Sequence, residues 1–79
     1  MARVLLFGPL RDLAGWRERE AEAASISELR ALLAAEDARL GEALSGPGVQ
    51  VALDQAIVRG DRPLAAGAEV AFLPPMSGG

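Results

Sequence analysis

The residues of this chain that can take part in chemistry are concentrated in its final run: Pro74, Pro75, Met76, Ser77, Gly78 and Gly79. Adjacent prolines hold a chain extended and donate no backbone hydrogen bonds. Glycines lack a side chain, so the closing pair fits a channel too narrow for any other residue. The reactive group is the carboxylate of Gly79. We therefore expect Gly79 to be the reactive position and the five residues before it to thread into partner sites.

A carboxylate is unreactive until it is activated, and adenylation by a partner enzyme with ATP would make Gly79 an acyl donor. An activated glycine has two fates, because it can be joined to an amine or can take up sulfur as a thiocarboxylate. A passive end of the chain is the third interpretation of a terminal Gly-Gly pair. The residues of the tail leave these three interpretations open.

The side chains offer little other chemistry. The 79 residues include no His, Lys, Tyr or Cys, which removes the usual general base, amine, phenol and thiolate. A net charge of −3 and scattered arginines argue against nucleic-acid binding. With no signal peptide and no membrane-length apolar run, we expect a cytoplasmic protein. We expect no nucleic-acid or membrane partner, no metal site and no cofactor bound by the chain itself.

Alternating apolar residues predict strands over residues 3–7, 49–53, 56–58 and 69–73. Charged residues alternating with small ones over residues 17–23 indicate an edge strand protected by charge. The first and last of these strands are apolar on both faces. Such strands are typical of sheet centres, so we expect these two to be adjacent and parallel.

One substantial helix is predicted after Ser25, whose hydroxyl can cap the amide of Glu28 in a capping box. Shorter helical patterns cover residues 10–14 and 37–44, and Gly41 weakens the second. The apolar face of the main helix carries Ile26, Leu29, Leu32 and Leu33. The face expected to lie in water carries Glu28, Arg30 and Glu36.

This order predicts an α+β fold of the β-grasp type known from ubiquitin, a mixed sheet of four to five strands with one main helix on one face. The domain would span residues 1–73, and residues 74–79 would form the extended tail. The other sheet face would expose an apolar patch at the root of the tail, formed by Leu5, Phe7, Ala71 and Leu73. Such a patch marks a partner surface, unless residues 10–16 fold over it.

Three segments resemble one known family. Residues 4–15 (VLLFGPLRDLAG), 51–55 (VALDQ) and 64–79 (LAAGAEVAFLPPMSGG) are similar to its strand and LRELAG turn, its VAVNQ hairpin and its Pro-Pro-x-x-Gly-Gly ending. The family is that of the MoaD-type sulfur carriers, the small subunits of molybdopterin synthase. Asp54 stands where the family commonly has Asn, which puts a turn hydrogen bond in doubt.

The resemblance implies that Gly79 is adenylated by a MoeB-like enzyme using ATP and then becomes a thiocarboxylate. The tail would enter a MoaE-like large subunit, which holds the catalytic side chains and where the sulfur passes to cyclic pyranopterin monophosphate in molybdenum cofactor biosynthesis. The family's interface positions map onto Phe7, Ile57 and Leu73. Arg11, on the short helix beside Phe7, either pairs across this interface or is solvated.

Two alternatives share the fold. A sulfur carrier of the thiazole-synthesis type is the nearest, although residues 7–15 and the Pro-Pro spacer argue against it. A ubiquitin-like modifier joined through Gly79 to lysines of other proteins belongs to a different class. A plain binding module with a passive tail is the third possibility.

Overall fold

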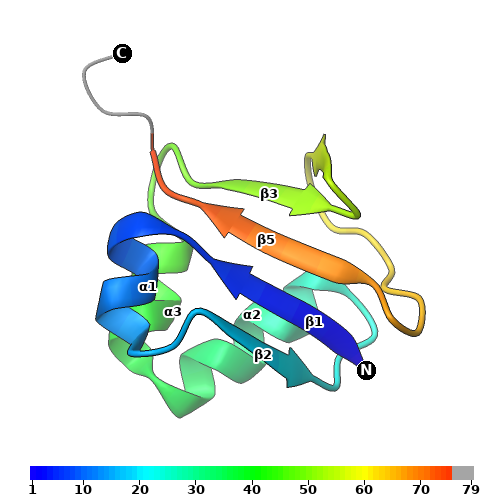
Figure 1. Ribbon diagram of the computed structural model, residues 1–79, viewed down its shortest axis with the longest axis horizontal. Helices are drawn as coiled ribbons and strands as arrows, with labels where there is room; N and C mark the ends of the chain where they lie inside the picture. The colour runs from blue at the N-terminus through cyan, green and yellow to red at the C-terminus, as the bar shows by residue number, and fades with distance from the viewer. Residues whose placement is uncertain (76–79) are drawn as a thin grey trace.

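The computed structural model describes residues 1–75, which form a mixed five-stranded sheet with three helices on one side (Figure 1). The elements in chain order are β1 (Ala2–Leu6), α1 (Gly8–Ala14), β2 (Glu18–Ala21), α2 (Ile26–Glu36), α3 (Ala38–Leu44), β3 (Gln50–Leu53), β4 (Ala56–Val58) and β5 (Glu69–Leu73). The strand order is β2-β1-β5-β3-β4. β1 and β5 pair in parallel near the centre and every other pair is antiparallel, which confirms the predicted β-grasp arrangement.

The core lies between the sheet and the helices. Successive side chains of a strand point to opposite faces, and on β1 and β5 every second residue is fully buried against the helices: Val4, Leu6, Val70 and Phe72. From α2 the buried residues are Ile26, Leu29 and Leu33, all on its predicted apolar face. Leu32 is partly buried against the same cluster.

The start of α2 confirms the predicted cap, and its exposed face requires a correction. The Ser25 hydroxyl accepts a hydrogen bond of 3.1 Å from the Glu28 amide. Arg30, expected in water, is half-buried. Its Nη1 donates to the Leu44 carbonyl at 3.0 Å, and its guanidinium lies over the Phe72 ring at 5.6 Å. The long arginine stem covers apolar surface while the charged group satisfies a carbonyl in the last turn of α3.

α1 differs from the prediction in length and position. It begins at Gly8, two residues earlier than expected, because Pro9 is tolerated in a first helical turn, where no amide donor is needed. Its Leu10 is buried in the core, and the helix packs against α3. The alternative that residues 10–16 fold over the other sheet face is therefore wrong. The two shorter helical patterns predicted over residues 10–14 and 37–44 are both present, as α1 and α3, in the same layer as the main helix α2 (Figure 1).

Gly41 marks the closest approach of α2 and α3. It is buried, and a Cβ placed on it would lie 2.6 Å from the Ala34 Cα and collide with the Ala34 Cβ. The sequence presents Gly41 as a weak position in a helix. In the folded chain this glycine is what lets the two helix backbones pack directly against each other.

We predict that Gly41→Ala destabilises the domain by about 1–3 kcal/mol, because the added methyl group overpacks the helix contact. Helix propensity alone predicts the opposite sign, a gain of up to about 1 kcal/mol. Urea denaturation of both proteins measures the difference. A more stable Gly41→Ala variant would show that the two helices do not depend on this contact.

The loop that enters β5 is tied to the first turn of α2 through Asp61. Its carboxylate accepts hydrogen bonds of 2.8 Å from both the amide and the hydroxyl of Ser27. These bonds, with a further one from the Arg62 amide, lower the pKa of Asp61 below its ordinary value of 3.8. Negative charge here also complements the amino end of the helix.

The lowered pKa of Asp61 predicts a pH dependence of stability. A carboxylate with a depressed folded-state pKa contributes stability above its unfolded-state pKa and loses it as the pH falls through the folded-state pKa. We expect Asp61→Asn to be less stable than the parent at neutral pH, and the difference to shrink as the pH falls below 3.8. Denaturation series at several pH values measure this, with Asp12→Asn as an exposed control. A difference that persists undiminished in acid would contradict it.

Candidate functional site

The root of the tail lies at one end of the sheet. β5 runs parallel to β1 and antiparallel to β3, so the end of β5, the end of β1 and the start of β3 meet there (Figure 1). Pro74 and Pro75 follow β5 at this point, the first partly buried and the second exposed. The predicted positions Met76, Ser77, Gly78 and Gly79 lie outside the described residues, and their role stays a prediction.

The sheet face opposite the helices has a shallow apolar centre. Across the strands, Leu5 lies beside Ala71, Ala71 beside Ala52, and Ala52 beside Ile57. None of the helices within residues 1–75 covers this face. The two central alanines are buried, with Ala52 8% and Ala71 6% exposed, so the predicted exposure of Ala71 is wrong and the exposed apolar surface of this face comes from larger side chains.

Phe7, Ile57 and Leu73 form what we call the open-face patch. Phe7 is 45% exposed and Ile57 52% exposed, unusually high values for large apolar side chains. Phe7 has extended backbone angles, φ −127° and ψ 151°, and so continues the alternation of β1 onto the face of Leu5. Leu73, partly buried, lies two residues from Ala71 on β5 and shares its face. The structure thus brings three of the four predicted interface residues to one face.

Arg11, the fourth, lies on the exposed side of α1. Its Nε is 3.8 Å from Asp12 Oδ1, and both side chains are well exposed, so this ion pair contributes little. The residue borders a shallow hollow together with Gly15, Trp16 and Arg17. Its predicted pairing across an interface stays a prediction.

The open-face patch is limited to the tail end of the sheet, because charged residues occupy the other end of the same face. At the other end of the same face, Arg3 lies between Glu20 and Glu69 across the strands. Arg3 Nε also forms an ion pair of 2.6 Å with Glu18. The apolar surface available to a partner therefore lies beside Pro74, whereas the end of the sheet away from the tail is charged and exposed to water.

The turn between β3 and β4 contains the hydrogen bond that the replacement of Asn by Asp54 had put in doubt. The backbone of Asp54 is left-handed, with φ +49°, and its Oδ1 accepts a hydrogen bond of 3.0 Å from the Glu69 amide. The Asp54 amide in turn donates to the Glu69 carbonyl at 2.8 Å. An aspartate therefore makes the turn contact that an asparagine oxygen would make, and Asp54 acts as a turn residue.

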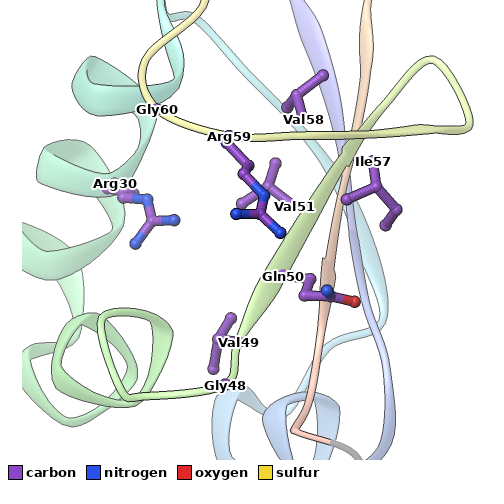
Figure 2. A pocket seen from close by; sticks show the side chains of 9 residues that line it. All are labelled: Arg30, Gly48, Val49, Gln50, Val51, Ile57, Val58, Arg59 and Gly60. Atoms are coloured by element: carbon purple, nitrogen blue, oxygen red, sulfur yellow. The ribbon is translucent and has the colours of Figure 1, made fainter.

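A groove of about 330 Å³ lies beside the tail root, between α2 and the β3–β4 hairpin (Figure 2). The side chains of Arg30 and Arg59 face each other across it, and Gly48 borders it at the end nearest the tail (Figure 2). Sequence reasoning did not find this groove, because its lining comes from three separate segments. The signal in the sequence was the Gly46-Pro47-Gly48 loop, which predicted a turn and not a neighbour of the tail.

Residues 1–75 contain no group of three or more acidic side chains arranged to hold a metal ion, and no helix in them is long and apolar enough to cross a membrane. The site consists of the central strand β5, the open-face patch and the tail, which continues β5 beside this patch. These features define a ubiquitin-like β-grasp domain whose central strand leads into a C-terminal Gly-Gly sequence.

Comparison with known proteins identifies the family to which the chain belongs. The ThiS family model matches residues 4–79, and the chain belongs to this family. It is 38% identical over 81 aligned residues to the molybdopterin synthase sulfur carrier subunit of Escherichia coli K12, and the alignment covers 100% of both chains.

Solved structures agree on the fold. A chain of the complex of subunits 1 and 2 of the molybdopterin-converting factor from Helicobacter pylori superposes with a TM-score of 0.73 at 26% identity, covering 99% of this chain and 97% of that one. The small archaeal modifier protein 1 from Methanosarcina acetivorans superposes with a TM-score of 0.87 at 21% identity, covering 99% and 95%. The second likeness establishes the fold alone.

Proposed function

We propose that this chain is the sulfur carrier subunit of a molybdopterin synthase. The observation that carries the proposal is its 38% identity, over the whole of both chains, to the sulfur carrier subunit of Escherichia coli. In this function Gly79 is adenylated, becomes a thiocarboxylate and gives its sulfur to cyclic pyranopterin monophosphate. The chain thereby serves molybdenum cofactor biosynthesis.

The chemistry of the chain supports the role of a carrier. The Gly79 carboxylate attacks the α-phosphate of ATP in the activating enzyme, releasing pyrophosphate and leaving an acyl adenylate. Sulfide from a sulfur donor then forms a C–S bond at the carbonyl carbon as the C–O bond to AMP breaks, and the thiocarboxylate holds the sulfur until transfer. Since the chain has no His, Lys, Tyr or Cys, the proton transfers of these steps belong to its partners.

The open-face patch supports docking to those partners. Burying Phe7, Ile57 and Leu73 removes apolar surface from water directly beside the tail. The Helicobacter pylori relative, solved as a complex of subunits 1 and 2, supports a MoaE-like large subunit as one partner. A MoeB-like activating enzyme needs the same tail, so we propose that the two bind this surface in turn. Arg11, exposed on α1, is proposed to pair with an acidic group at the margin.

A second candidate function is a ubiquitin-like modifier joined through Gly79 to amines of other proteins. The observation that favours it is the likeness in fold to a small archaeal modifier protein. The two functions share adenylation and diverge afterwards, since one product is a thiocarboxylate and the other a stable amide. A carrier for thiazole synthesis would share the thiocarboxylate and differ in the acceptor of the sulfur.

Mass spectrometry of the intact chain tests the proposal. We expect chain isolated from its native cells to include a species in which one oxygen of Gly79 is replaced by sulfur. The same species should form with activating enzyme, ATP and a sulfur donor, and a chain lacking Gly78 and Gly79 should not form it. Recovery of amide conjugates only, with no thiocarboxylate, would favour the modifier. Failure to form an adenylate would overturn both functions.

Charge placed in the open-face patch tests the docking surface. We expect Phe7→Asp to weaken binding to the large subunit by at least about tenfold, because an unpaired carboxylate would be buried on association. The fold should tolerate the change, because Phe7 is the N-cap of α1 and Asp is a favoured N-cap residue.

Titration calorimetry measures this affinity. Ala35→Asp adds the same charge at an exposed position of α2 and is the matched control. Equal affinities for the Phe7→Asp and Ala35→Asp variants would exclude this face as the interface.

A further inference from the structure

Two glycines touch the root of the tail. A methyl group at Gly8 would lie 3.3 Å from Pro74 Cγ, and one at Gly48 would lie 2.9 Å from Pro75 Cβ. The second distance is shorter than nonbonded carbon atoms accept. Gly8 and Gly48 are 40 residues apart in sequence, yet each lies against one of two consecutive prolines.

The topology explains why these two positions meet the tail. Gly8 follows β1, and Gly48 lies two residues before β3. β1 and β3 are the neighbours of β5 on either side, so the two loops flank the chain where it leaves the sheet. Figure 2 shows the Gly48 loop beside the end of β5.

Because prolines restrict rotation of the backbone, contact at the root of the tail affects the direction of the residues that follow. A residue that precedes proline is restricted to extended conformations, which applies to both Leu73 and Pro74. Each proline also has its own φ fixed near −65°. With few internal rotations left, the first tail residues move nearly as one piece, and contact from two loops limits the angle at which that piece leaves the sheet.

We propose that Gly8 and Gly48 are positioning residues that set the direction in which the tail leaves the domain, and so deliver Gly79 to the active sites of its partners. Gly79 lies four residues beyond Pro75, a span of at most about 13 Å. A change in the exit direction at Pro75 shifts the region that Gly79 can reach within this span. Since displacement of about 1 Å can lower a reaction rate about 100-fold, the exit angle matters to transfer. This inference rests on the proposed function.

The test compares Gly48→Ala with Gly67→Ala. Both glycines have left-handed backbones, with φ +85° and +80°, so alanine strains both alike. A methyl group at Gly67 would meet nothing within 4 Å, and Gly67 precedes β5 at the end of the sheet far from the tail. Gly67→Ala therefore carries the backbone strain without the contact to the tail.

The readout is adenylation of the chain by its activating enzyme, followed as ATP–pyrophosphate exchange. Here the chain is the substrate, so partial unfolding raises its apparent KM and leaves kcat unchanged. A misdirected tail on a folded, docked domain lowers kcat instead. We expect Gly48→Ala to lower kcat about tenfold with KM nearly constant, Gly8→Ala to lower it less, and Gly67→Ala to leave it unchanged.

Equal kcat values for the Gly48→Ala and Gly67→Ala variants would overturn the inference while leaving the proposed function intact. If Gly48→Ala does not fold, the same comparison is made with Gly8→Ala, whose methyl group meets only Pro74 Cγ. A nuclear Overhauser contact between Gly48 and Pro75 is expected in the parent and in Gly67→Ala. Its absence from the parent would overturn the inference independently of any activity, even if the chain were never adenylated.

Discussion

The parallel pairing of β1 with β5 is the interaction on which the rest of the structure depends. It joins the first and last strands of the chain at the centre of the sheet, and it aligns Val4 with Val70 and Leu6 with Phe72. All four side chains are fully buried. Because this pairing closes nearly the whole chain into one loop, its entropic cost is met only when the helices cover the same four residues. The sheet and the helical layer therefore stabilise each other.

The same pairing organises the site. β5 is hydrogen-bonded to a neighbouring strand on each side, so the tail starts from a strand that is held on both edges. The alternation that buries Phe72 on one face places Ala71 and Leu73 on the other, beside Phe7 and Ile57. The core and the open-face patch are thus built on the two faces of one strand.

A domain of this size has a small free energy of unfolding. Three contacts between its elements help to maintain it. Gly41 lets α2 and α3 approach until their backbones touch. Arg30 covers the Phe72 ring and satisfies the last turn of α3. Asp61 ties the loop before β5 to the start of α2. Each contact secures an element that supports β5, and through it the point from which the tail leaves.

The sequence by itself determined which segments are strands and helices and that the first and last strands are central, and it led to the prediction that the chemistry belongs to Gly79. These conclusions follow from local signals: the period of two in β1 and β5, the cap at Ser25, and the missing nucleophiles. Phe7 and Leu73 were placed on the open face by alternation alone. Only the tertiary structure showed which residues Arg30 and Gly41 contact, and it alone placed Gly8 and Gly48 beside Pro74 and Pro75. Each of them meets a residue of another segment, and the spacing of residues along a sequence does not encode distances between segments that meet only on folding.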